Sequence, residues 1–170
     1  LWSPFGEFLR FKTALPLKLT ELAILVTGRR WTSQVEWWAH SRIAAEAGIA
    51  PAIINAIKDL SSPVFHEREQ FEVYEFARLL QQNGQVPLDI YQAVQTRWQT
   101  RGVVELTAVI GYDTMVAMTL NAHLIPVPNG PPRFPQNLRS SLFHQESSSV
   151  SNDFRSGNCC GPDSLDAQSN

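Results

Sequence analysis

Cysteine is nearly absent from this chain of 170 residues, which contains two. Two cysteines are too few for a framework of several disulfides or for a zinc site made of four thiolates. Both stand near the end of the sequence, as the adjacent pair Cys159 and Cys160, so residues 1–125 contain none. The part of the chain that we expect to fold can therefore carry out no thiol chemistry of its own.

The sequence also lacks an excess of charge and a long apolar run. Its 14 Lys and Arg residues nearly balance 16 Asp and Glu residues, so a nucleic-acid partner is not expected. We find no apolar run that approaches the ~18 residues of a transmembrane helix and no leader-like start. These absences predict no membrane partner and a cytoplasmic protein. Because the sequence opens at Leu1 within an apolar segment, we expect the natural N-terminus, and any leader peptide, to lie upstream.

Composition changes at Pro126, which suggests a domain boundary. Six of the 11 prolines lie between Pro126 and Asn170, together with a cluster of serines at residues 147–151. Such a segment buries too little apolar surface to offset the entropy lost on ordering it. We therefore predict a helical domain at residues 1–125 and a disordered tail at residues 126–170.

The domain is predicted to be all-α. Glycine and proline stand at the ends of segments, and no run alternates with a period of two. Thr20 is expected to cap the first clear helix, and the last helix is apolar almost all round, which suits a central position or a subunit interface. The predicted helices, about six in number, cover residues 20–30, 33–47, 51–60, 66–83, 87–98 and 102–125.

Polar residues gather in an apolar setting between Glu21 and His40. Ser33, Glu36 and His40 are spaced three and four apart, so they share one helical face beside the apolar Trp37. A carboxylate and an imidazole in a dry pocket tune each other's protonation, which general acid/base catalysis requires. If the intervening turn folds the first two helices together, Glu21 meets the same face.

Each of these residues also has a purely structural interpretation. Glu36 and His40 can form an exposed i, i+4 pair that stabilises the helix by ~0.2–0.5 kcal/mol. Glu21 can be a first-turn acid that favours the helix dipole. Ser33 suits an N-cap better than a nucleophile, and a tryptophan such as Trp37 is more often found in a core than on a substrate.

Arg29 and Arg30 stand near the turn between the first two predicted helices. A bidentate contact with a substrate carboxylate is one interpretation, and a solvated or acid-paired surface position is the other. The histidines and acids show no metal-ligand spacing such as H-E-x-x-H, so we predict neither a metal nor another cofactor.

The spacing of the polar residues resembles that of a known superfamily, that of alkylhydroperoxidase D and carboxymuconolactone decarboxylase. Its mark is a glutamate twelve residues before a C-x-x-C-x-x-x-H run. Here Glu21 matches the glutamate, Ser33 and Glu36 stand at the two cysteine positions, and His40 stands at the histidine. The later run GVVELTAVIGYDTMVAMTLNAHLIPVP is similar to the closing helix of the decarboxylase-like branch, including Glu105, Gly111, Tyr112 and Asn121. The similarity covers residues 5–128.

This resemblance implies an alkylhydroperoxidase D-like helical bundle and a non-redox activity. Thiol peroxidases need one thiolate to attack the peroxide and a second thiol to resolve the intermediate, and Ser33 and Glu36 can supply neither. The resemblance therefore points to decarboxylase-like acid/base chemistry on a small cyclic carboxylate or lactone. His40 and Glu36 would share the proton transfer, and Glu21 would orient the imidazole or relay a proton.

We also predict partners. One is a small-molecule substrate, with Arg29, Arg30, Ser33 and Trp37 as the candidate substrate-binding residues. Because members of this superfamily commonly form trimers or hexamers, we expect a homo-oligomer, in which the apolar last helix is covered. The alternative is a non-catalytic oligomeric scaffold or binding module of the same fold.

Overall fold

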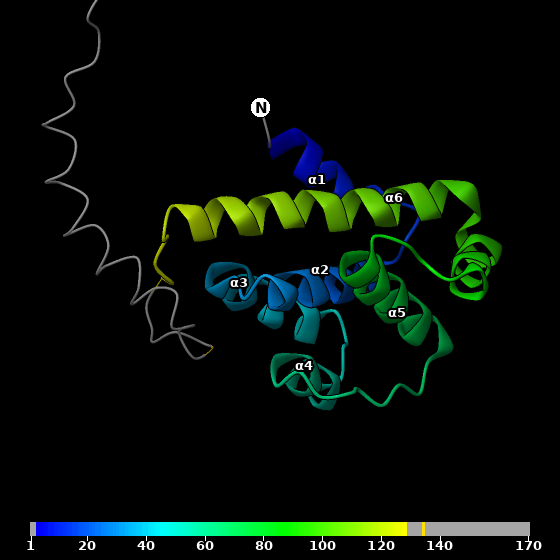
Figure 1. Cartoon of the computed structure of the whole chain (residues 1–170), viewed down its shortest axis with the longest axis horizontal. Helices are drawn as coiled ribbons and strands as arrows, with labels where there is room; N and C mark the ends of the chain where they lie inside the picture. The colour runs from blue at the N-terminus through cyan, green and yellow to red at the C-terminus, as the bar shows by residue number, and fades with distance from the viewer. Residues whose placement is uncertain (1–2, 129–133, 135–170) are drawn as a thin grey trace, which may run out of the picture. The chain divides into compact units, whose positions relative to one another are not determined.

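The computed structural model describes residues 3–128 and residue 134. Within them the chain forms six helices and no strand, which confirms the all-α prediction. The helices are α1 (Ser3–Phe11), α2 (Leu17–Arg30), α3 (Gln34–Glu46), α4 (Pro51–Lys58), α5 (Arg68–Asn83) and α6 (Leu88–Ala122) (Figure 1). Cys159, Cys160 and most of the tail for which disorder was predicted lie outside the described residues.

Several predicted helix ends are correct. Pro51 opens α4, where a missing N–H costs no hydrogen bond, and Gly84 ends α5 in the left-handed conformation, with φ 70°. The prediction that Thr20 caps the first clear helix is wrong. That helix, α2, begins at Leu17, because Pro16 supplies the flanking backbone conformation and Thr20 already lies inside the first turns.

The number of helices agrees with the prediction, but the helices are divided differently. α1 lies in a segment for which no helix was predicted, and α6 covers two predicted helices. At Gln99 the backbone leaves the helical conformation (φ 59°, ψ −178°), and α6 changes direction there (Figure 1). The break falls between the two predicted helices, at residues 87–98 and 102–125.

α2 is the central helix of the bundle. It packs against α3, α5 and α6, and every residue from Leu19 to Gly28 is buried. Its core side chains include Leu19, Leu22, Ile24 and Leu25, which meet Val73, Phe76, Leu106 and Val109 in one apolar cluster. A helix buried on all sides carries its polar residues into the interior, which is how Glu21 comes to be enclosed.

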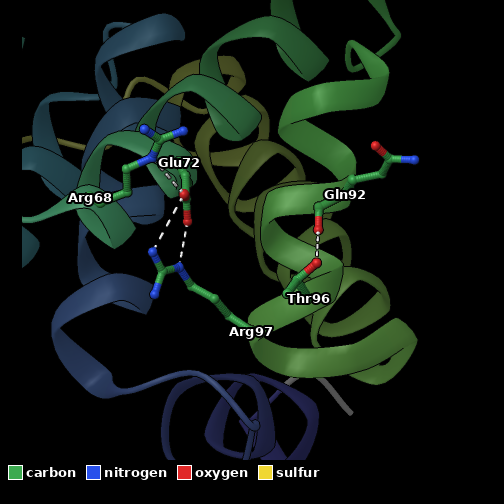
Figure 2. A network of polar contacts seen from close by, with 5 residues as sticks. All are labelled: Arg68, Glu72, Gln92, Thr96 and Arg97. Carbon is green, nitrogen blue, oxygen red and sulfur yellow. Dashed lines mark hydrogen bonds and ion pairs between the residues drawn. The ribbon is translucent and has the colours of Figure 1, made fainter.

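An ion-pair network around the buried Glu72 joins α5 to α6. The carboxylate of Glu72 accepts hydrogen bonds from Nε of Arg97 at 2.6 Å and from Nε of Arg68 at 3.1 Å (Figure 2). Next to this network, Thr96 bonds to the backbone of Gln92 within α6. Because Glu72 is buried, the two arginines compensate a charge that would otherwise be costly to desolvate.

α6 corrects the expectation that no segment is long and apolar enough for a transmembrane helix. By length and composition alone it would be able to cross a membrane, a test that the core helix of a soluble protein also passes. Its second part carries the buried acids Glu105 and Asp113, and it packs against α1, α2 and α5. Val104 and Met118 of the same helix are exposed, so part of its apolar surface is left uncovered by the described residues.

Phe134, from beyond α6, packs against the corner between α2 and α3. Its ring lies edge-on to Trp37, with centroids 5.1 Å apart, and under the guanidinium of Arg29 at 4.6 Å. The side-chain amide of Gln34 makes two hydrogen bonds of 3.0 Å with the backbone N–H and carbonyl of Phe134. This residue of the predicted tail therefore belongs to the same compact unit as the helices.

Candidate active site

α2 and α3 bring Glu21 and His40 into contact. The two helices run back against each other through a tight turn, in which Ser33 N–H donates to the carbonyl of Gly28 at 2.8 Å. Nδ1 of His40 then lies 2.7 Å from Oε2 of Glu21, which is 0% exposed, while the His40 side chain is 13% exposed. An ionised carboxylate only accepts hydrogen bonds, so Nδ1 donates to it and Nε2 remains for a second partner.

α1 adds an arginine that the sequence did not predict at this site. Nη2 of Arg10 lies 3.4 Å from Oε1 of Glu21, the carboxylate oxygen that does not face His40. Nε of Arg10 is buried and has no hydrogen-bond partner among residues 3–128 and 134. The Nε–H group of Arg10, which contacts Glu21 through Nη2, is therefore a hydrogen-bond donor without an acceptor among these residues.

Glu36 enters the same region from the first turn of α3 and is 4% exposed. α2 approaches it closely at Gly28, where an added methyl carbon would lie 3.5 Å from Cβ of Glu36. Neither carboxylate oxygen has a hydrogen-bond partner in the described ranges. Burial, reinforced by the charge of Asp113, raises the pKa of Glu36 to about 8, although the nearby Ser33 hydroxyl lowers it somewhat without a hydrogen bond of standard geometry.

Asp113 of α6 completes the cluster and was missed by the sequence reasoning. It is 6% exposed, and burial raises its pKa to about 7. The positive charges of His40 and Arg10 oppose that rise, whereas the negative charge of Glu21 adds to it. Asp113 therefore interacts electrostatically with all three residues. Its signal in the sequence was a lone acid within the apolar run VIGYDTMVAM.

Four helices thus assemble three buried carboxyl groups, one imidazole and one guanidinium. We call these five residues, Arg10, Glu21, Glu36, His40 and Asp113, the acid/base cluster. Two of the carboxyl groups, Glu36 and Asp113, lose their protons near neutral pH instead of near pH 4. Near pH 7 Glu36 is a proton donor and Asp113 is close to half ionised. Groups with pKa values in this range are suited to general acid/base catalysis.

Ser33 and Trp37, predicted to bind substrate, are both buried. Ser33 stands at the N-cap of α3 and is fully buried, but its hydroxyl makes no capping hydrogen bond. Trp37 is buried in the core and packs against Phe134. The structure places Ser33 beside Glu36, and it places the Trp37 ring in the core cluster.

Arg29 and Arg30 do not lie at the acid/base cluster. Both line a cavity of about 810 Å³ whose walls include no member of the cluster. Nε of Arg29 donates to the carbonyl of Lys58 at 2.7 Å, and the guanidinium of Arg30 lies 5.9 Å from the ring of Trp31. The arginine that reaches the cluster is Arg10.

Two further polar residues of α6, Glu105 and Asn121, contact the segments between helices. Glu105 accepts hydrogen bonds from the backbone N–H of Ala14 and from Nε of Arg101, the latter at 2.7 Å. Asn121 is exposed, and its side-chain amide donates to the carbonyl of Trp31 at 2.8 Å. Both residues fasten α6 to connecting segments.

In the part of the chain that the structure describes, no three His, Cys, Asp or Glu side chains are arranged to hold a metal ion. Comparisons with family models, with curated proteins and with solved structures find no match to this chain.

Proposed function

We propose that this chain is a carboxymuconolactone decarboxylase-like enzyme with an alkylhydroperoxidase D-like fold. It acts by acid/base chemistry without thiols on a small cyclic carboxylate or lactone, as a cytoplasmic trimer or hexamer. One observation carries the proposal. The Glu21–His40 contact of 2.7 Å lies in a cluster with Glu36 and Asp113, two buried carboxyl groups whose pKa values are near neutral.

Decarboxylation beside an unsaturated lactone needs what such a cluster can supply. The bond between the ring carbon and the substrate carboxylate breaks, carbon dioxide leaves, and the electron pair stays on the carbon. That carbon must then receive a proton. In our proposal the protonated Glu36 or the His40 imidazolium donates it, and solvent returns a proton to the cluster afterwards.

Glu21 and Arg10 would act in support of this transfer. Glu21 would hold the imidazole of His40 in one orientation through the 2.7 Å contact, in the manner of a carboxylate behind a catalytic histidine. Arg10 offers a buried N–H without a described partner, which suits a bond to the substrate carboxylate. This assigns to Arg10 the role that the sequence suggested for Arg29 and Arg30.

Peroxide reduction is disfavoured by the chemistry of the same positions. Ser33 and Glu36 stand where the redox branch of the resembling family has its two thiols. A hydroxyl cannot cycle through sulfenic acid, and a carboxylate cannot form a disulfide. We therefore propose a lyase rather than a thiol peroxidase.

The test is to offer small carboxylated lactones and related cyclic acids to the purified protein and to follow carbon dioxide release. We expect His40→Gln and Glu36→Gln to lower the rate by about 10²–10⁴-fold, the usual contribution of a positioned acid or base. His66→Gln is the matched control, because His66 is exposed and lies outside the cluster. Equal rates for wild type and His40→Gln, or no release by either, would contradict the proposal.

A non-catalytic scaffold of the same fold is the second candidate. It is favoured by two cavities among the described residues that no member of the acid/base cluster lines. Under this alternative, Glu21 and His40 serve only to join α2 to α3. A screen in which no cyclic carboxylate is turned over, although Glu36 titrates near pH 8, would favour the scaffold.

A further inference from the structure

A second concave site lies where the end of α2 meets the segment between α4 and α5 and one face of α5. The cavity measures about 810 Å³, within the range of small-molecule sites. Gly28 of α2 faces Glu36, whereas the next two residues, Arg29 and Arg30, line this cavity. The cavity is therefore distinct from the acid/base cluster, and the inference drawn from it goes beyond the proposed function.

The lining of the cavity has an excess of positive charge. It contains Arg29, Arg30 and Arg78 against Glu75, which leaves a net charge of two. Arg78 is already paired with Glu75 through two bonds of 2.7 and 2.9 Å. Neither Arg29 nor Arg30 forms an ion pair with any residue that the structure describes. The two unpaired arginines would attract an anion.

Arg29 is held in place before any ligand arrives. Nε donates to the carbonyl of Lys58 at 2.7 Å, Nη1 donates to Oγ1 of Thr32 at 3.1 Å, and the guanidinium lies over the ring of Phe134. These bonds leave Nη2 for another acceptor. Burial lowers the pKa of Arg29, an effect that the charge of Asp59 opposes, so its cation is incompletely compensated. A ligand carboxylate bound to the Arg29 guanidinium would offset the free-energy cost of burying its positive charge.

An aromatic wall faces the same cavity. Phe65 lies 5.1 Å from Tyr74 and 6.3 Å from Phe71, measured between ring centroids, and all three residues line the cavity. Flat apolar rings pack well against such a wall, face to face or edge to face.

We propose that this cavity is a second binding site, which takes a small organic carboxylate that carries a flat ring. The carboxylate binds between Arg29 and Arg30, and the ring packs on Phe65 and Tyr74. Charge and apolar surface are both needed, so the neutral amide of the same ring is a poor ligand.

The test uses 2-naphthoate and its neutral counterpart 2-naphthamide as probes of the full chain, followed by ¹H–¹⁵N NMR. We expect 2-naphthoate to shift the backbone signals of Arg30 and Tyr74, and 2-naphthamide to bind at least about tenfold more weakly. Equal binding of the two probes, no binding of 2-naphthoate at millimolar concentration, or shifts centred on Glu36 and His40 would overturn the proposal.

Variants separate this site from other anion-binding surfaces. We expect Arg30→Gln to weaken 2-naphthoate binding about tenfold, and because the Arg30 side chain is exposed, the fold does not depend on it. Arg42→Gln is the matched control, since Arg42 is an exposed arginine on α3. It should leave the dissociation constant within about twofold. A loss of equal size in both variants would show a general charge effect and overturn the site.

The outcome does not depend on the proposed enzyme activity. His40→Gln removes a member of the acid/base cluster that does not line the cavity, so it should leave 2-naphthoate binding unchanged. If 2-naphthoate binding fails while carbon dioxide release is lost in His40→Gln, the second site is wrong and the proposed function stands. If 2-naphthoate binds as expected while His40→Gln leaves carbon dioxide release unchanged, the proposed function is wrong and the second site stands.

Discussion

At the scale of single residues, Glu36 combines deep burial with a missing hydrogen-bond partner among the described residues. Its pKa is raised to about 8 in the folded chain, against about 4.3 for an unfolded glutamate. Between these two values the folded chain binds more protons than the unfolded chain, so stability falls as pH rises. The raised pKa therefore lowers the stability of the fold at neutral pH and keeps the Glu36 carboxyl group protonated there.

Glu36→Gln should therefore stabilise the protein in a pH-dependent way. Glutamine keeps the shape but cannot ionise, so the variant avoids the cost of either protonating or burying a carboxylate. We expect urea unfolding to give a free energy about 4–5 kcal/mol higher than that of wild type at about pH 8.5, and a difference below about 1 kcal/mol at about pH 4.5.

Glu105→Gln is the control of opposite sign. Burial would raise the pKa of Glu105, but the Ala14 N–H and Arg101 outweigh it and lower the pKa. Its stabilisation is present above the pKa of unfolded glutamate and is lost as pH falls through the lower folded value. Glu105→Gln should lower the melting temperature at pH 7, and this difference should shrink as pH falls below the pKa of unfolded glutamate. The same pH trend for both variants would contradict the assignment.

The sequence indicated part of the acid/base cluster and missed the rest for a physical reason. Glu21, Glu36 and His40 lie on two helices joined by a short turn, so their spacing alone predicts that they can meet. Arg10 and Asp113 reach the cluster from α1 and α6, across long stretches of chain. Their positions depend on how distant helices pack, and helical periodicity contains no information about that.

At the scale of elements, the break in α6 depends on close packing between its two segments. An added methyl group at Gly102 would collide with Cβ of Trp98, one turn earlier, because the backbone turns at Gln99. Gly102→Ala should then destabilise the protein by about 1–3 kcal/mol, which chemical denaturation can measure.

Gly111→Ala is the matched control within the same helix. A methyl group there meets no atom within 4 Å, and alanine favours helix over glycine. We expect it to be neutral or stabilising by up to about 1 kcal/mol. If Gly102→Ala were equally well tolerated, the packing at the break would be looser than described.

Periodicity and turn residues were sufficient to predict most helices. Pro51 and Gly84 are fixed by backbone chemistry and were placed correctly, whereas α1 was missed. α1 has nine residues, a length at which an isolated helix is marginal and depends on its neighbours. The packing of Phe5 on Tyr112, with ring centroids 5.7 Å apart, provides such a neighbour.

At the scale of the whole molecule, the folded unit extends past the end of α6. Phe134 is 3% exposed and contacts Arg29, Gln34 and Trp37. Phe134→Ala should lower the free energy of unfolding by about 3–5 kcal/mol, as expected for a buried aromatic residue. Phe11→Ala, at an exposed position, should change it by less than about 1 kcal/mol. Equal effects would place Phe134 outside the core.

Assembly is the second property at this scale. The exposed apolar side chains of α6, such as Val104, are a surface that a further subunit would cover. We predict a trimer or hexamer by light scattering, which Val104→Glu should dissociate. Val64→Glu, at another exposed position between α4 and α5, should leave it intact. A monomeric wild type would contradict the prediction.

The central claim is that the fold keeps the buried carboxyl group of Glu36 protonated at neutral pH, within electrostatic range of Asp113. Carbon-13 NMR of the glutamate side-chain carboxyl groups, followed from pH 3 to pH 10, measures this directly. We predict one glutamate signal that titrates near pH 8 and is missing from Glu36→Gln. If every glutamate titrated below about pH 5.5, as ordinary carboxyl groups do, the acid/base role of this site would be wrong.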